Sequence, residues 1–417
     1  MKLKYQYTYF IYPYVLQKEK YTNYLATLLN DKNCKIKVFE KGKDIDIYNY
    51  FGINTKTYMF QSFAFNKAET RELQEQTTEQ KARILSQMPV LFLEYNIPEN
   101  IQGKAIDENL GIYFGIQKIE LVLFNTGVCF FMIKTNIEET DKFSDLLQFN
   151  YKFKTIGQER EGLANAEGIK IQTNAFNSTN ELMDLILHLT GNPIRKDTLS
   201  ESLTDKFFTY SYACVDTESW NDNTNEESLN NMFYKFFNIL PNDYNNYVDN
   251  KINNTDLFKE SKYIKFGFSR SGATLLASGI DLYNYTKLPV AFENEYLYTL
   301  LITLYQKIYI GKINLEFKNE NNKKLETTKK EFITFTKTIW FREITEDEIG
   351  VKLYNRWKQT FSIDEEYQEI KSKYNIIYKT KDVEENKQLN TILLTVITIA
   401  FIINLITFIL YRIWKWT

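Results

Sequence analysis

A short polar segment between two apolar runs contains the side chains best suited to binding an anion. Residues 266–273 read FGFSRSGA, so two glycines bracket two serines and an arginine. Hydroxyl groups, a guanidinium and flexible backbone together can hold a phosphate, which makes Ser269, Arg270 and Ser271 candidate ligand-binding residues. A hairpin turn with a solvated arginine is the alternative. The chain has no G-x-x-x-x-G-K-[ST] motif, which argues against nucleotide hydrolysis of that type.

A second turn joins two strongly apolar runs within residues 118–134 (KIELVLFNTGVCFFMIK). Asn125 and Thr126 precede Gly127, a residue that adopts positive φ without steric cost. The pattern predicts a β-hairpin. Asn125 and Thr126, the polar residues of this turn, are further candidate ligand-binding residues.

Metal and nucleophile chemistry has little support in the composition. The single histidine, His188, lies in an apolar run and is expected to be a packed helix residue. Cys34, Cys129 and Cys214 are scattered without metal-ligand spacing and are expected to be reduced thiols. No zinc site, catalytic triad or bound cofactor is expected, apart from a candidate nucleotide ligand. A formal net charge of −2 gives no reason to expect direct binding of nucleic acid.

The C-terminal region contains the strongest signal in the sequence. Residues 388–411 form a run of 24 residues without a charge, and Arg412, Trp414, Lys415 and Trp416 follow it. A helix of this length reaches about 36 Å, enough for a hydrocarbon core of about 30 Å. The N-terminal segment lacks a small-residue cleavage site. The sequence therefore predicts a single-pass, tail-anchored membrane protein whose body is cytosolic.

Polar residues inside this run are candidate pore or helix–helix contacts. Thr391, Thr395 and Thr398 are spaced i, i+4, i+7 and share one helix face, while Asn404 and Thr407 fall on the opposite face. An amide in lipid favours a partner on another helix, whereas a threonine can bond to its own backbone. The pattern predicts a homo-oligomer in contact with the bilayer.

The rest of the chain predicts an α+β or α/β cytosolic body, a long helical stalk and one C-terminal transmembrane helix. Four segments are expected: 1–205, 206–290 with the candidate ligand loop, 291–390 with long helices and stalk, and 391–417. Strand patterns lie at 5–15, 35–39, 57–65, 118–134, 207–215 and 263–277. Helix patterns lie at 19–30, 67–88, 138–150, 227–240, 292–317 and 331–341.

A capping box at residues 345–348 (TEDE) predicts that a further helix starts there. A coiled-coil-like seam at 4-3-4-3 spacing follows, formed by Ile363, Tyr367, Ile370, Tyr374 and Ile377. Tyrosine at two seam positions favours a loose bundle, or packing on the preceding long helix, over a tight dimer.

The order of these parts resembles the CorA architecture of oligomeric cation channels. The stretches that carry the resemblance are LVLFNTGVCFFMI (121–133), KFGFSRSGATLLA (265–277), EYLYTLLITLYQKIYIG (295–311) and the stalk at 345–390. They are similar to divergent CorA-like proteins, including membrane effectors associated with type III CRISPR systems. The Gly-Met-Asn loop and second membrane helix of CorA channels are missing here. Selective magnesium transport is therefore not implied.

The resemblance implies an oligomer whose cytosolic domain senses a nucleotide second messenger in antiviral defence and whose membrane helices form or gate a pore. A non-conducting, membrane-tethered scaffold that recruits partner proteins is the main alternative. A membrane-bound enzyme is the third, although no pair of carboxylates stands apart from solvated helix charge.

Overall fold

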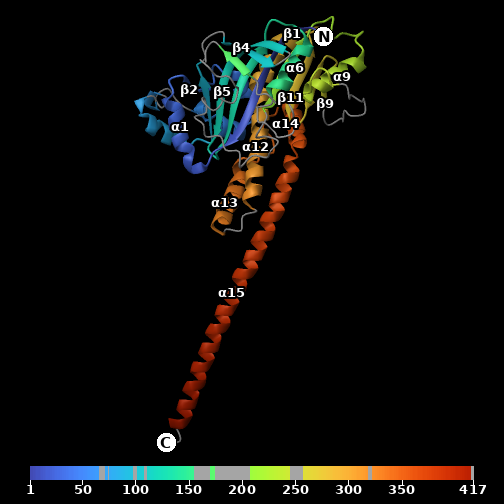
Figure 1. Cartoon of the computed structure of the whole chain (residues 1–417). Helices are drawn as coiled ribbons and strands as arrows, with labels where there is room; N and C mark the ends of the chain where they lie inside the picture. The colour runs from blue at the N-terminus through green and yellow to red at the C-terminus, as the bar shows by residue number, and fades with distance from the viewer. Residues whose placement is uncertain are drawn as a thin grey trace.

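A mixed α+β body and one projecting helix make up the structure, a computed structural model (Figure 1). It describes residues 1–64, 71–73, 75–96, 101–107, 110–154, 170–173, 207–244, 257–317 and 322–414. The projecting helix, α15 (Ile363–Trp414), begins beneath the body and runs away from it. The predicted α+β class and the apolar C-terminal helix are thereby confirmed.

Among the described residues, one sheet of eleven strands forms the centre of the body. Its order is β2-β3-β5-β6-β1-β8-β11-β10-β9, and β4 and β7 are joined to it through β5. The strands are β1 (Leu3–Val15), β2 (Cys34–Ile36), β3 (Val90–Tyr95), β4 (Ile101–Asp107), β5 (Leu110–Phe124), β6 (Val128–Ile137), β7 (Lys170–Thr173), β8 (Phe208–Val215), β9 (Leu257–Ser261), β10 (Ile264–Phe268) and β11 (Gly272–Ser278). Described pairs are antiparallel except β8 with β11, which is parallel.

Strand β1 connects the first two predicted segments into this single sheet. Thr8 pairs with Thr135 of β6 on one side and with Ser211 of β8 on the other. Side chains of β1 alternate between two cores, with Tyr9 in one and Phe10 in the other. A strand buried on both faces reads as a continuous apolar and aromatic run, which is why residues 5–15 give such a clear strand signal.

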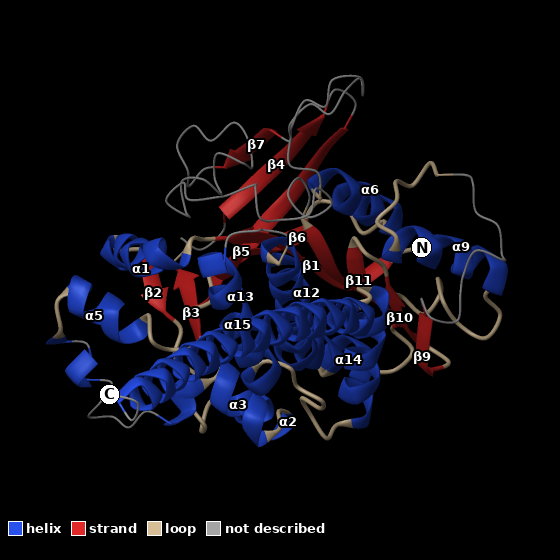
Figure 2. Cartoon of the chain, turned by 90° about the horizontal axis from the view of Figure 1, so that it is seen from below, coloured by secondary structure: helices blue, strands red, loops and turns tan. Residues whose placement is uncertain are grey.

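Helices cover both faces of the sheet. The helices are α1 (Tyr21–Asn30), α2 (Ile45–Tyr50), α3 (Ile53–Met59), α5 (Thr78–Leu85), α6 (Phe143–Phe153), α9 (Glu226–Phe237), α10 (Tyr283–Thr286), α11 (Leu288–Ala291), α12 (Leu297–Glu316), α13 (Asn322–Thr338) and α14 (Glu348–Thr360). In Figure 2, α6 and α9 lie on one side of the row of strands, and α2, α3 and α14 lie on the other. The residues of α12, α14 and α15 share a core with the second of these faces.

The hairpin predicted at 118–134 is present as β5 and β6. Gly127 has φ of +93°, and a Cβ atom there would lie 2.3 Å from the Leu16 carbonyl oxygen. The turn therefore requires glycine both for its backbone conformation and for space.

One local expectation is wrong, and tertiary packing explains it. Residues 57–65 do not form a strand, because α3 and the short helix η2 (Gln61–Ala64) occupy the described part of this range. The aromatic content that suggests a strand serves a core instead, since the Phe60 ring stacks on Phe92 at 5.6 Å. The helix predicted to start at residues 345–348 is present as α14, which begins at Glu348. Its N-cap is Asp347 and not Thr345, whose hydroxyl donates a hydrogen bond to the Tyr50 carbonyl.

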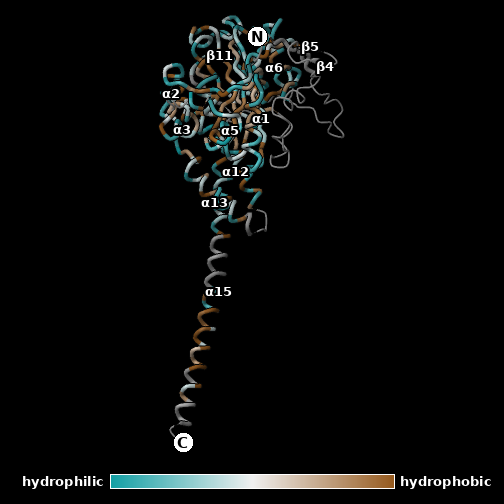
Figure 3. The backbone as a smooth tube through the Cα atoms, turned by 90° about the vertical axis from the view of Figure 1, so that its left-hand side faces the viewer, coloured by the Kyte–Doolittle hydropathy of each residue, from teal (hydrophilic) through white to brown (hydrophobic). Residues whose placement is uncertain are grey.

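The apolar seam at the start of α15 packs against other segments of the same chain. Ile363 and Ile370 are fully buried in the core shared with α12, and the Tyr367 ring stacks on Trp340 at 4.0 Å. The predicted packing of the seam on the preceding helices is therefore present. Beyond this packed part, the distal half of α15 is strongly apolar (Figure 3).

Candidate functional site

The candidate anion-binding loop is the β10–β11 turn, and its first serine already has structural partners. Ser269 donates a 2.6 Å hydrogen bond to the Phe237 carbonyl at the end of α9 and accepts a 3.0 Å bond from the Gly272 N–H. Arg270 is exposed at the turn, and Ser271 is half-buried. Only Arg270 and Ser271 therefore present side chains that are not committed to holding the turn by these bonds.

The glycines beside this loop are explained by helix packing. A Cβ atom at Gly267 would lie 2.3 Å from the Cβ of Phe237, and one at Gly272 would lie 2.7 Å from Ile239. The hairpin thus needs glycine so that the end of α9 can approach it closely. Glycines at these positions are typical of a flexible phosphate-binding loop. In the structure, their lack of a side chain instead lets the end of α9 pack against the hairpin.

The structure does not bring the two candidate turns together. Both lie at the same end of the sheet, but β6, β1, β8 and β11 separate the 125–127 turn from the 269–271 turn. At about 4.8 Å per strand, the turns lie roughly 19 Å apart across the sheet. The Thr126 hydroxyl is also buried, beside Tyr305 of α12, and is not offered to solvent.

The threonines of the apolar helix are satisfied by their own backbone. Each hydroxyl donates to the carbonyl four residues earlier, at 2.8 Å for Thr391, 2.8 Å for Thr395, 2.7 Å for Thr398 and 2.9 Å for Thr407. These hydroxyls need no partner from another helix. The side chain of Asn404 lies outside the part of the chain that the structure describes.

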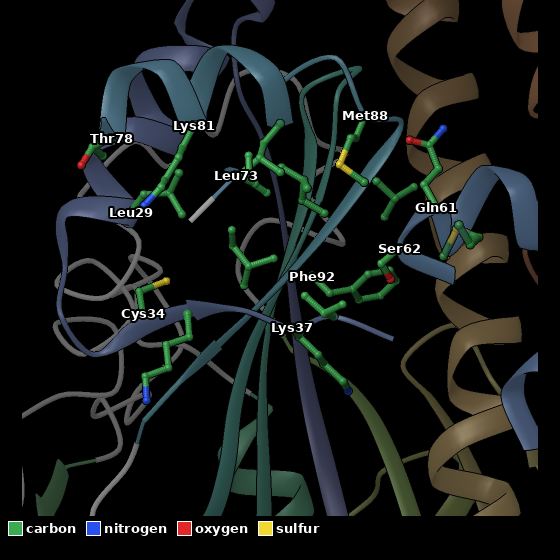
Figure 4. A pocket seen from close by; sticks show the side chains of 17 residues that line it. Leu29, Cys34, Lys37, Gln61, Ser62, Leu73, Thr78, Lys81, Met88 and Phe92 are labelled. Atoms are coloured by element: carbon green, nitrogen blue, oxygen red, sulfur yellow. The ribbon is translucent and has the colours of Figure 1, made fainter. Parts of the chain in front are cut away.

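A pocket of about 410 Å³, here called the edge pocket, opens at the β2 edge of the sheet (Figure 4). Strand β2 has three residues and pairs only with Leu93–Tyr95, so the first half of β3 forms the pocket floor. Apolar side chains from α1, α3, α5, β3 and the segments next to them dominate its wall: Leu29, Val38, Met59, Leu73, Leu85, Met88, Val90 and Phe92. Volume and lining are typical of a small-molecule site.

Lys37 connects the edge pocket to the interior of the body. Its side chain lines the pocket, but its ammonium group points away from it (Figure 4) and lies 2.8 Å from the Glu120 carboxylate and 2.9 Å from the Tyr298 hydroxyl. Burial alone would raise the pKa of the Glu120 carboxyl, but the charges of Lys37 and Lys118 outweigh it and hold that pKa below its usual value. Lys37 is therefore a charged link between sheet edge and α12.

A second ion pair lies on the same sheet face. Glu293 accepts hydrogen bonds from Lys134 at 2.6 Å and from the Tyr9 hydroxyl at 2.7 Å. Glu293 belongs to a single π-helical turn, η4 (Phe292–Tyr296), which leads directly into α12. Such turns often occur at functional positions in helices. Here the turn directs a carboxylate against the sheet just before α12 begins.

Helix α12 contacts both the pocket wall and α15. The Tyr298 ring packs edge-on against Phe92 of the pocket, with centroids 5.5 Å apart. Further along α12, Lys307 pairs with Glu366 of α15, and Lys373 of α15 donates a 2.6 Å hydrogen bond to Asn314. One rigid helix thus touches the pocket at one end and the C-terminal helix at the other.

Sequence reasoning missed Lys37, Glu120 and Tyr298, although two of them left a signal. Lys37 lies in an alternating CKIKVF pattern, and Glu120 interrupts an otherwise apolar strand. A single charged residue in a buried strand indicates an oppositely charged partner elsewhere in the fold. The sequence does not identify that partner residue. Tyr298 is one of many tyrosines and gives no local signal.

Fold and site together define a mixed α+β body with an edge pocket, joined to a C-terminal helix that is long and apolar enough to cross a membrane. Within the described ranges, no group of three or more His, Cys, Asp or Glu residues is arranged to hold a metal ion. No protein-family model, curated protein or solved structure matches the chain.

Proposed function

We propose that the chain is a tail-anchored, oligomeric membrane effector whose cytosolic body senses a small ligand and transmits binding to its membrane helix. The contact of α12 with both Lys37 at the edge pocket and Glu366 of α15 is the observation that carries this proposal. A ligand that displaces Lys37 or Phe92 would shift Tyr298, and α12 would pass that shift to α15.

The membrane part of the proposal depends on the distal segment of α15. Lys387–Phe408 is apolar, and none of its most apolar stretch is buried in the body, which disfavours a core helix of a soluble protein. The packed seam ends near Ile377, about 15 Å of helix before Lys387 at 1.5 Å per residue. Because helix continues through this interval, we propose that it acts as a stalk.

A conducting path would need several chains, because a lone helix has no lumen. The seam is already packed against α12 and α13, and the threonine hydroxyls are bonded to their own helix. Assembly would therefore depend on Asn404 and on body surfaces. The CorA-like resemblance supports this oligomer and supports a nucleotide messenger as one class of ligand, with antiviral defence as the setting.

A scaffold that recruits partner proteins is the second candidate. Large apolar side chains are exposed near α10 and α11, with Leu282 62% and Val290 49% accessible. A cluster of exposed apolar residues is a common feature of protein-binding surfaces. This function would need neither a pore nor a ligand.

Reconstitution of the full chain in dye-loaded liposomes, with cross-linking to count subunits, tests the proposal. AMP and a cyclic dinucleotide serve as nucleotide probes. We expect an oligomer whose leakage changes with a ligand, and Asn404→Leu should weaken assembly by about 0.6–2 kcal/mol per lost interhelical hydrogen bond. Ile402→Leu is the matched control. A monomer that leaks contradicts the pore, and an oligomer that never leaks favours the scaffold.

A further inference from the structure

Two lysines bring positive charge to the edge pocket, although one of them, Lys35, lies opposite Glu94 in the pairing of β2 with β3. Lys35 of β2 is exposed and Lys81 of α5 is half-buried, and among the described residues neither forms an ion pair. The ammonium group of Lys37, by contrast, is already paired with Glu120. None of the described residues lining this pocket is Asp or Glu, and Glu72 lies in an adjoining hollow.

The two charges are placed on different walls of an apolar space. Lys81 extends from α5 toward Leu29 (Figure 4). Lys35 belongs to the edge strand β2. The rest of the wall consists mainly of aliphatic and methionine side chains, including Leu85 and Met88. Such a site is complementary to a molecule with an apolar body and one anionic end.

We propose that the edge pocket binds an anionic amphiphile, an alkyl chain ending in a carboxylate or phosphate. This deepens the proposed function, because it names the ligand class that the body would sense. Each buried methylene would raise the affinity by about fourfold, and the lysines would select the anionic end. The only aromatic side chain in the described wall, Phe92, is 5% exposed and packs on Tyr298, so a nucleotide base has no free ring to stack on.

Calorimetric titration of the full chain in phosphatidylcholine nanodiscs tests this inference, with protein-free nanodiscs subtracted. Decanoate is the probe, decan-1-ol is its neutral counterpart, and AMP represents nucleotides. We expect saturable binding of decanoate, at least about tenfold weaker binding of decan-1-ol, and weaker binding still of AMP. A parallel titration with decyl lysophosphatidate separates a lipid source from a free fatty acid.

Substitutions of residues that line the edge pocket test whether the ligand binds there. The double substitution Lys35→Gln and Lys81→Gln should weaken decanoate binding by about tenfold while leaving decan-1-ol unchanged. Lys20→Gln, an exposed lysine away from the pocket, should change neither. Met88→Trp should block both ligands, with circular dichroism to check the fold. If it misfolds, the double lysine variant decides.

Several results would overturn the inference: equal affinity for decanoate and decan-1-ol, tighter binding of AMP, or no effect of the double lysine variant. Dye leakage from liposomes is recorded separately. Decanoate binding without any leakage response would contradict the proposed function alone. Leakage triggered by AMP without decanoate binding would contradict the ligand class alone.

Discussion

The ammonium group of Lys37 donates a 2.9 Å hydrogen bond to the hydroxyl of Tyr298, although 261 residues separate them in the chain. The bond ties the short edge strand β2 to the first turn of α12. Because Lys37 also neutralises Glu120, removing it would affect both the buried carboxylate and the link to the C-terminal helices.

Lys37→Met should destabilise the body by about 3 kcal/mol at pH 7, because it leaves the buried Glu120 carboxylate with only the more distant Lys118, at 3.5 Å, among its described ion-pair partners. The folded pKa of Glu120 is lowered, so the pair stabilises fully above the ordinary value of 4.5 and less as pH falls below it. Denaturant unfolding at pH 7 and in acid measures the free energy of unfolding of both proteins and its pH dependence. Lys43→Met, in an exposed pair with Glu40, is the control, and equal effects of the two variants would contradict the assignment.

Tyr367→Ala should loosen α15 from the body. Tyr367 is 7% exposed and its ring stacks on Trp340, so the substitution removes buried aromatic surface at a cost of about 3 kcal/mol. The free energy of unfolding of Tyr367→Ala is compared with that of Ile376→Ala. Ile376 is a suitable control because it lies on the same helix and its side chain is 65% exposed. Similar losses for both variants would argue against intramolecular packing of the seam.

Glu295→Gln should stabilise the protein at alkaline pH. Burial, with Asp347 and Asp46 nearby, raises the pKa of Glu295 to about 7. The folded state therefore binds this proton more tightly than the unfolded chain, and stability is lost as pH rises from 4.5 through 7. Glutamine avoids that loss. The gain should be about 1 kcal/mol at pH 8, because partial exposure screens the interaction, and near zero at pH 4.

Thermal unfolding across this pH range checks the Glu295 prediction. Glu346→Gln, at an exposed position near the start of α14, is the control. A gain that is the same at pH 4 and pH 8 would show that the charge of Glu295 is not responsible.

Ser269 and Arg270 should respond differently to alanine. Ser269→Ala removes the bond to the Phe237 carbonyl and should cost about 1 kcal/mol, whereas Arg270→Ala should leave unfolding nearly unchanged. If the turn binds phosphate, Arg270→Ala should also weaken AMP binding by about 1.5–3 kcal/mol. Calorimetry that shows no difference would leave the hairpin turn as the only role of this loop.

If the apolar run anchors the chain as proposed, truncation after Lys387 should release the protein from membranes. Sedimentation of membranes after expression provides the test, and full-length Asn404→Leu should stay in the pellet. A truncated chain that still pellets would place the membrane contact in the body.

Local sequence patterns alone determine several parts of this protein. The apolar run of α15, the buried strand β1 and the turn at Gly127 each depend on neighbouring residues, so composition and spacing suffice to predict them. The strand predicted from local sequence at residues 57–65 is wrong, because aromatic residues in this range pack into a core from helical segments.

The sheet order and the pocket were decided by tertiary structure. Nothing in the sequence around Lys37 indicates that Glu120 and Tyr298 would neutralise and orient its ammonium group, since both partners lie on distant elements. Glycines that suggested a phosphate loop make room for α9 instead. Long-range pairing depends on how all strands and helices pack at once, and that information is not contained in any single window of the chain.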